Sequence, residues 1–528
     1  MSAEAAEAIA APPVTIDEEH LIRSVIRLAW PVVVQQVSFS MVQLVDTALV
    51  GHLGEDSLAG VRLAGQIFWF SQAGMMALAV GSTAVIARNV GANRPELASR
   101  TLRNAILMAA AWGVLVGLVM WFLGSSWLKL LGAEPEARHQ GTVYLKAAAV
   151  GMPFWSLTYA GSASLQGAGD TRTPMAIGVL VNATNIVIAY TLINGRGPFP
   201  RLDVLGSGAG FSGAAIIGGS LVLTVLASGT RIIHWYPWEA LRFDPTEAGR
   251  VLNVGVPTGL EQIQFNIAFM TYTRIIASLG TTVLAAHGVT LAIQSLTFNV
   301  GFGLSVATTA LVGQSLGAQR PDLAERSTHV TIRYSLAFMI ALGAVLMIFG
   351  AQITDLFVGG KNADEVVHIG RQLLFVFAFA MPALAVSLCL GGGLRGAGDT
   401  RAVLLIMAGT TWIVRLIPAY LLAITFGLGV PGCDSGRGVG RRSRSDRCLL
   451  PIASVRIVRP AMIIYTLRNC PTCDKARSAL HERGIEFEER RVDENAKWWD
   501  EALNYGITVP VILWDNGDVE VGWEGEHG

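Results

Sequence analysis

Long apolar segments separated by short polar ones extend from residue 28 to residue 427. Each segment holds about 20 residues or more, the length that an α-helix needs to cross about 30 Å of hydrocarbon. The pattern predicts six such helices in a first half and five in a second, at 28–50, 64–87, 104–124, 143–165, 175–195, 210–230, 254–278, 288–312, 331–350, 372–393 and 403–427. A soluble helical core rarely needs so many uncharged segments, so we expect an all-α polytopic membrane bundle.

The two halves repeat each other. Pro31 and Pro257 are 226 positions apart (257 − 31), and Gly-Ala-Gly-Asp-Thr-Arg occurs unchanged at 167–172 and 396–401. In an apolar chain, two homologous halves are typical of secondary transporters. Because six helices return the chain to the side it left, the halves are predicted to be parallel repeats.

Composition and charge narrow the class of protein. The chain is 52% hydrophobic and only 15% charged, with a mean hydropathy of +0.48, whereas soluble domains carry about 25% charged residues. A formal net charge of zero gives no reason to expect a nucleic-acid partner. In the first half, ten arginines lie in loops on the same side as the N-terminus, and six arginines and lysines lie in loops on the other side. Because basic loop residues stay on the cytoplasmic side, this predicts a cytoplasmic N-terminus. We expect a monomer in a bacterial-type cytoplasmic (inner) membrane, embedded in the lipid bilayer.

Two loop motifs recur at the side of the predicted N-terminus. In Gly-Ala-x-Arg-Pro, the glycine suits the left-handed position that ends a helix and the proline stops continuation. In Gly-Ala-Gly-Asp-Thr-Arg, the glycines permit a tight reversal, and Asp170 or Asp399 can cap the next helix. We interpret both as loop-shaping, with a gate on the cytoplasmic rim as the alternative. Neither contains the lysine of an ATP-binding loop, so transport is expected to use an ion gradient and no cofactor.

These motifs carry a family resemblance. Val-Asp-Thr-Ala-Leu-Val-Gly-His-Leu-Gly at 45–54, the Gly-Ala-x-Arg-Pro loops and the doubled Gly-Ala-Gly-Asp-Thr-Arg resemble the multidrug and toxin extrusion (MATE) family over residues 20–430. The resemblance implies two six-helix lobes around a V-shaped cavity. It also implies efflux of small organic compounds, commonly cationic, against inward proton or sodium flow.

Asp46 is the first candidate for ion coupling. A charge at membrane depth is costly, so an acid there is a functional candidate. Gln36, Gln43 and Asp46 fall at spacings of seven and three, which places them on one helical face. The alternative is a hydrogen-bonded structural aspartate near the interface.

Asn182 and Asn185 are expected to hydrogen-bond Asp46 or a coupling cation. The proton-coupled branch of the resembled family implies an aspartate four positions after this asparagine, and the chain has Ala189 there. The coupling site therefore has one acid or shares its role with another residue.

Glu261 is the other candidate for this role. Gln262 and Gln264 flank it, and Gln262 is the repeat counterpart of Gln36. Glu261 is predicted either to serve coupling or substrate contact, or to form a structural pair with Arg274 or another base. The four glutamines 36, 43, 262 and 264 are candidate cavity residues.

Residues 461–528 have the pattern of a separate α/β domain. A strand at 463–467 precedes Cys470-Pro-Thr-Cys473, an amphipathic helix follows, and further strands are expected at 487–492 and 508–513. A Cys-x-x-Cys between a strand and a helix indicates a thioredoxin-like redox site. Cys470, at the helix N-terminus, would attack a disulfide, and Cys473 would resolve the mixed disulfide. Zinc would need two more ligands, so no metal site is expected.

This stretch resembles the glutaredoxin family over nearly all its length. Pro510 matches that family's cis-proline, which implies a place beside Cys470. The family's later Gly-Gly-x-Asp element is not evident around 522–525. The expected reductant is therefore glutathione or a thioredoxin-type protein.

The junction between the two parts is unusual. The repeat predicts a twelfth helix at 439–459, yet residues 433–460 hold seven arginines, which cannot cross a membrane. Eleven spans would also put the redox domain outside the cytoplasm. Either the last helix does not fully cross, or a shifted reading frame joins two genes. The expected parts are a cytoplasmic tail at 1–27, a first lobe at 28–235 and a second lobe at 250–430. A basic linker at 431–460 and a glutaredoxin-like domain at 461–528 follow.

The leading functional hypothesis is an antiporter that exports small organic compounds and carries a redox module. One alternative is a thiol-disulfide oxidoreductase fused to a truncated, inactive transporter. The other is a flippase of lipid-linked precursors, which would favour a more basic cavity.

Overall fold

The computed structural model describes residues 21–196, 199–236, 238, 242–278, 280–355, 363–421, 462–468, 470–482, 487–494, 498–499, 502, 508–513 and 519–523. The chain divides into two compact units, Met1–Leu421 and Leu422–Gly528. The linker predicted at 431–460 and the helix predicted at 439–459 lie outside the described residues, as do residues 1–20 of the predicted tail.

The first unit is a helical bundle made of two lobes, which confirms the predicted fold class. The first lobe consists of α2 (Leu21–Gly51), α3 (Glu55–Gly91), α4 (Pro95–Leu130), α5 (Pro135–Gly167), α6 (Arg172–Asn194) and α7 (Asp203–Ala227). The second consists of α8 (Pro245–Ala277), α9 (Thr281–Gly317), α10 (Pro321–Asp355), α11 (Ala363–Ala397) and a last helix formed by α12 (Thr400–Gly409), the π-helix η2 (Thr410–Leu416) and α13 (Ile417–Tyr420).

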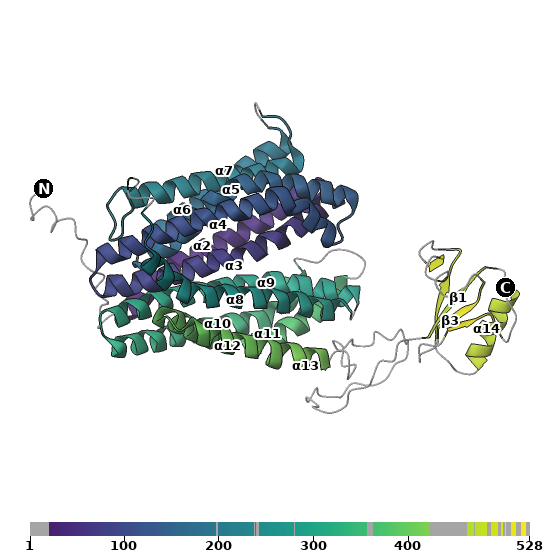
Figure 1. Cartoon of the computed structure of the whole chain (residues 1–528). Coiled ribbons are helices and arrows are strands. Elements are labelled where there is room, and N and C mark those ends of the chain that lie inside the picture. The colour runs from purple at the N-terminus through teal and green to yellow at the C-terminus, as the bar shows by residue number, and fades with distance from the viewer. Residues whose placement is uncertain are drawn as a thin grey trace, which may run out of the picture. The chain divides into compact units, whose positions relative to one another are not determined.

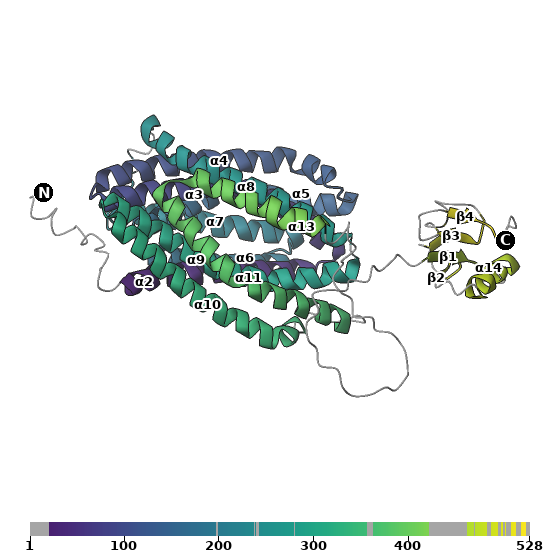
Figure 2. The same ribbon diagram turned by 90° about the horizontal axis from the view of Figure 1, so that it is seen from below.

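Nine helices within the described residues are long and apolar enough to cross a membrane, and α5 and α8 are the two that fall outside this set. Figure 1 shows α5, α6 and α7 on one side of the bundle, α10 to α13 on the other, and α3, α8 and α9 between them. Seen from below, α10 and α11 run side by side (Figure 2).

Glycines bring the two lobes into close contact where α3 and α9 end. A Cβ atom on Gly91 would meet the backbone of Gln314, and one on Gly317 would meet the backbone carbonyl of Arg88. These repeated glycines were predicted to take the left-handed conformation, and this is wrong. The left-handed residues are Asn93 (φ 55°) and Gln319 (φ 56°), because the helices continue through the glycines and turn two residues later.

The Gly-Ala-Gly-Asp-Thr-Arg loops behave as predicted. Gly169 and Gly398 have φ values of 90° and 86°, which a residue with a side chain rarely adopts. Asp170 accepts a hydrogen bond from the backbone N–H of Thr173 at 3.1 Å, and Asp399 accepts one from that of Ala402 at 3.1 Å. Both aspartates therefore satisfy free N–H groups at a helix start.

The second unit contains a four-stranded sheet with the order β2-β1-β3-β4. Its elements are β1 (Met462–Thr466), α14 (Pro471–Glu482), β2 (Phe487–Arg491), β3 (Val511–Leu513) and β4 (Val519–Val521). β1 pairs parallel to β2 and antiparallel to β3, and β3 pairs antiparallel to β4. Ile464, Leu480 and Ile512 are fully buried where α14 packs on the sheet. This mixed sheet with a helix opening at Cys-x-x-Cys agrees with the predicted thioredoxin-like fold.

Candidate transport and redox sites

Asp46 lies near the end of α2, where three helices of the first lobe meet. The hydroxyl of Ser207 in α7, itself buried, donates a hydrogen bond of 2.9 Å to its Oδ1 atom. The phenol of Tyr144 in α5 is close enough to interact electrostatically with the carboxylate. The side chain of Asp46 is half-buried.

Asn182 bonds to Ser38 rather than to Asp46, and the alternative, that it binds a coupling cation, stays a prediction. Its Nδ2 atom donates to the hydroxyl of Ser38 at 2.9 Å, and Ser38 is eight residues before Asp46, or about 12 Å along the helix. No hydrogen bond found within the described ranges joins Asn185 to Asp46 either. At the position where the resemblance implied a second acid, Ala189 is buried against Gly210 of α7, and this tight contact leaves little room for a carboxylate.

Glu261 forms a buried ion pair with Arg395, not with Arg274. The Nη2 atom of Arg395 in α11 lies 2.6 Å from Oε1 of Glu261, and the two side chains are only 12% and 14% exposed. Sequence reasoning left this partner unnamed. The repeat could have found it, because Arg395 stands where the first lobe has Gln166.

The first lobe has a neutral counterpart of this ion pair. Gln166 in α5 donates a hydrogen bond of 3.2 Å to Gln35 in α2. Gln35 is the repeat counterpart of Glu261, and Gln166 that of Arg395. The same contact is therefore an amide pair in one lobe and an ion pair in the other.

The predicted cavity glutamines differ in their surroundings. In the second lobe, Gln264 accepts a hydrogen bond of 3.0 Å from the indole of Trp412 in η2, and Gln262 donates one of 3.3 Å to Asn266. Asn266 in turn reaches the first lobe, where it donates to a backbone carbonyl of α3 at 3.4 Å. In α2, Gln36 is half-buried and Gln43 is exposed.

An arginine lies beside the second-lobe counterpart of Asp46. Tyr272 in α8 is the repeat counterpart of Asp46. The guanidinium of Arg415 in η2 lies 4.6 Å from the centre of its ring, and the buried His287 of α9 contacts the ring edge-on with centroids 5.6 Å apart. The contact of Arg415 with Tyr272 is a cation–π interaction, so a guanidinium lies next to the position in the second lobe where the first lobe has a carboxylate.

The cysteines of the second unit form a disulfide at the start of α14. Cys470 is 5% exposed and Cys473 is fully buried. The backbone N–H of Cys473 donates to the Sγ atom of Cys470 at 3.2 Å, so the helix N-terminus faces this sulfur. The Val509–Pro510 peptide bond is cis, and the carbonyl of Pro510 accepts a hydrogen bond of 2.7 Å from Gly522.

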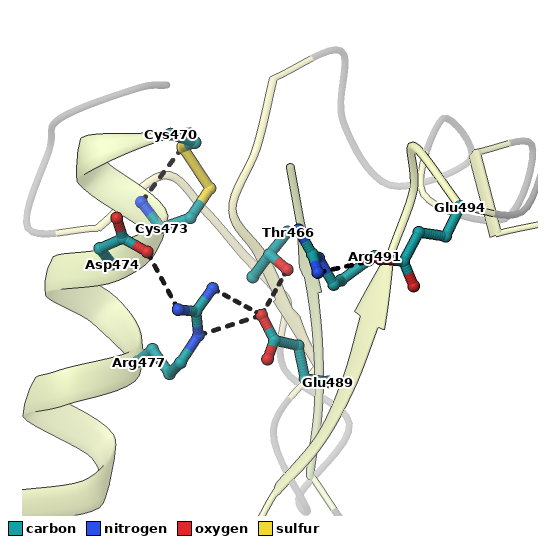
Figure 3. A network of polar contacts seen from close by, with 8 residues as sticks. All are labelled: Thr466, Cys470, Cys473, Asp474, Arg477, Glu489, Arg491 and Glu494. Atoms are coloured by element: carbon teal, nitrogen blue, oxygen red, sulfur yellow. Dashed lines mark hydrogen bonds and ion pairs between the residues drawn. A yellow bond between two sulfur atoms is a disulfide. The ribbon is translucent and has the colours of Figure 1, made fainter. Parts of the chain in front are cut away.

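A polar network links α14 to the sheet behind the disulfide. Figure 3 shows Arg477 between Asp474 and Glu489, with Nη2 2.7 Å from Glu489 Oε1 and Nη1 3.0 Å from Asp474 Oδ1. The hydroxyl of Thr466 at the end of β1 donates to the same Glu489 oxygen at 2.7 Å. This network fixes the helix against β1 and β2. Among the described residues there is no group of three side chains that could hold a metal ion.

Comparison with known proteins agrees with both parts of the chain. The MatE family model matches residues 31–191 and 257–421, which together make up more than half of the sequence. The chain belongs to the MatE family. The Glutaredoxin family model matches residues 462–519, so this MatE protein carries a glutaredoxin domain.

Several relatives are similar to the MatE part. The probable multidrug resistance protein NorM of Thermotoga maritima is 27% identical over 420 residues, which cover 78% of this chain and 88% of that protein. The multidrug resistance protein PmpM of Pseudomonas aeruginosa is 26% identical over 411 residues, covering 76% and 84%.

Solved structures show the same fold. A MOP superfamily transporter from Pyrococcus furiosus superposes with a TM-score of 0.73 at 21% identity, over 78% of this chain and 90% of that one. A MATE crystallised with MaL6 gives a TM-score of 0.74 at 21% identity, over 78% and 91%. The MatE part is thus a multi-pass membrane bundle of this fold.

Proposed function

We propose that this protein is a secondary antiporter that exports small organic compounds, chiefly cations, in exchange for protons or sodium ions. It works as a monomer in the cytoplasmic membrane, with its N-terminus in the cytoplasm. The observation that carries the proposal is the environment of Asp46. This carboxylate lies inside the first lobe, and its hydrogen-bond donor there is the neutral hydroxyl of Ser207.

An acid held by neutral groups inside a membrane bundle is suited to ion coupling. Its charge is costly to keep at that depth, and no ion pair to Asp46 is found in the part of the chain that the structure describes. Binding a proton or a sodium ion removes that cost, and releasing it on the other side restores it. Glu261 is already neutralised by Arg395, so coupling rests on Asp46.

The substrate is proposed to bind between the lobes. Gln36 and Gln43 of α2 and Gln262 and Gln264 of α8 offer amide donors and acceptors on the two helices that begin the lobes. Amides bind polar groups of many compounds without a fixed charge preference. This suits a transporter of varied substrates better than a flippase, which would need a basic cavity.

Dye efflux from everted membrane vesicles tests the coupling role. Asp46→Asn is expected to abolish pH- or sodium-driven efflux, because an amide cannot gain or lose a proton or hold a cation by charge. Asp203→Asn is the control: this carboxylate is exposed at the start of α7, four residues before Ser207, and should transport normally. Unchanged gradient-driven efflux in Asp46→Asn would remove Asp46 from the coupling role.

For the glutaredoxin domain we propose dithiol-disulfide exchange. The Cys470 thiolate attacks a substrate disulfide and releases one thiolate, and Cys473 then displaces the second. Two electrons pass to the substrate, which leaves the domain with the Cys470–Cys473 disulfide that the structure contains. Glutathione or a thioredoxin-type protein would return the two electrons.

An alternative function is that the redox domain alone is active. The arginine-rich sequence where the repeat predicts a twelfth helix favours it, because an incomplete second lobe would be less able to transport. Efflux that is absent both in the wild type and in Asp46→Asn, together with full disulfide reductase activity, would support this alternative.

A further inference from the structure

A cavity of about 340 Å³ lies between the lobes, at the end of the bundle where α3 ends. Both lobes contribute polar groups to its wall, Arg88 and Asn89 of α3 and Arg250 and Asn253 of α8, and the second lobe adds the glycine turn at Gly396 and Gly398 before α12. A guanidinium from each lobe therefore lines the same small space.

The two arginines are held differently. Nη1 of Arg250 lies 2.6 Å from Oε1 of Glu247, a buried carboxylate that also accepts a hydrogen bond of 2.9 Å from Thr101 in the first lobe. This contact fixes Arg250 through one of its nitrogens and leaves other N–H groups for a ligand. Arg88 is exposed, and no ion pair to it is found within the described ranges.

Charge at this cavity is positive in balance. Arg401 adjoins it, since its Nη2 atom donates to Asn253 at 3.3 Å. The acids nearby are Glu247, which holds Arg250, and Asp399, which caps α12. Three guanidinium groups thus face two carboxylates that are already engaged.

The repeat counterpart of Arg88 in the other lobe bonds to the backbone rather than lining this cavity. The counterpart of Arg88 is Gln314, which is buried and donates a hydrogen bond of 3.0 Å to the carbonyl of Gly167. Gly167 is in turn the counterpart of Gly396, which lines the cavity. At one contact, the amide of Gln314 therefore bonds directly to the glycine turn at Gly167. At the equivalent contact, Arg88 and the glycine turn at Gly396 line a cavity instead.

We propose that this cavity binds a phosphate-bearing anion, either free phosphate or the head group of an anionic phospholipid, between Arg88 and Arg250. The planar guanidinium group matches phosphate oxygens in pairs, and basic pockets between membrane helices bind phospholipid head groups. Because the two arginines belong to different lobes, the bound anion favours the arrangement in which the lobes touch at this end. Binding itself does not require that the chain transports.

The test measures thermal unfolding of the full chain in phosphatidylcholine nanodiscs. One arm adds inorganic phosphate at constant ionic strength, and the other replaces about a quarter of the lipid with phosphatidylglycerol. We expect a rise in Tm in at least one arm, because a ligand that binds the folded state stabilises it. A rise with free phosphate identifies the soluble anion, and a rise with phosphatidylglycerol alone identifies the lipid.

Variants locate the site. Arg88→Gln, which installs the residue of the repeat counterpart, should weaken the response roughly tenfold or more, and Arg88→Lys should retain part of it. Arg94→Gln removes an exposed charge at the same end of α3 but outside the cavity and should respond as the wild type does. No rise in either arm, an undiminished response in Arg88→Gln or an equal loss in Arg94→Gln would each overturn the proposal. Asp46→Asn should bind normally, which separates this site from failure of transport.

Discussion

Single residues differ between the lobes where their backbones agree. At the contact between the first helix and the fourth helix of each lobe, the first lobe has Gln35 with Gln166 and the second has Glu261 with Arg395. A buried ion pair gains its Coulomb energy only after both charges lose their hydration. Removing one partner of the ion pair therefore leaves a buried, unpaired charge, whereas removing one partner of an amide pair leaves only a neutral polar group and costs less.

This dependence can be measured with two substitutions. Arg395→Gln alone should lower the free energy of unfolding by about 3–5 kcal/mol, because it leaves the Glu261 charge buried and unpaired. Adding Glu261→Gln recreates the amide pair of the first lobe and should restore most of that loss. Stability of both variants is read from thermal unfolding in nanodiscs.

The exposed pair Arg201–Asp203 is the control, with side chains 66% and 55% exposed. Its loss in Asp203→Asn should cost no more than about 1 kcal/mol. A double variant as unstable as Arg395→Gln would show that the arginine acts through packing rather than charge.

The sequence predicted some of these residues and not others. Asp46 and Glu261 were found because acids inside apolar segments are rare. Their partners were harder to predict: Asn182, one candidate partner of Asp46, bonds Ser38 instead, and Arg395 was not named as the partner of Glu261. Periodicity says which side of a helix a residue occupies, but the neighbour across the contact depends on helix tilt and relative height.

At the level of helices, the apolar pattern was sufficient to predict each long helix of the two lobes, although α5 and α8 are not apolar enough to count as membrane spans. It could not say how they pack, and the repeated glycines are the clearest case. Gly91 and Gly317 were interpreted as helix terminators, yet they allow the backbones of α3 and α9 to touch. The π-helix is a second case. In the first lobe Asn182 bonds Ser38, whereas in the second lobe the counterpart of Ser38, Gln264, is bonded by Trp412, which lies one residue after the counterpart of Asn182 and within η2.

The crossing of α3 and α9 leads to a test on one helix. Gly91→Ala should destabilise the bundle by about 1–3 kcal/mol, because the new methyl group meets the backbone of Gln314 and forces the helices apart. Gly65→Ala in the same helix meets nothing within 4 Å and should be neutral or slightly stabilising. Equal stability of the two variants in thermal unfolding would show that the lobes do not meet closely at Gly91.

At the level of the whole molecule, two units carry unrelated chemistry. The membrane unit has the carboxylate of Asp46, for which we propose ion coupling, and the second unit has a disulfide at a helix N-terminus. The sequence predicted this division from a change in composition. It could not predict how the units influence each other, because residues 431–460 follow neither the pattern of the lobes nor that of the redox domain.

If the two units function independently, a substitution in either unit should abolish the activity of that unit alone. In the full chain, Cys470→Ser should abolish disulfide reduction and leave dye efflux unchanged, because the nucleophile is lost while the bundle is intact. Asp46→Asn should abolish efflux and leave reduction unchanged. Cys389→Ser, which alters a buried cysteine of α11, is the control for thiol loss and should retain reductase activity. If Cys470→Ser changes efflux in a reductant-dependent way, the redox domain regulates the transporter instead, and the two units form one functional system.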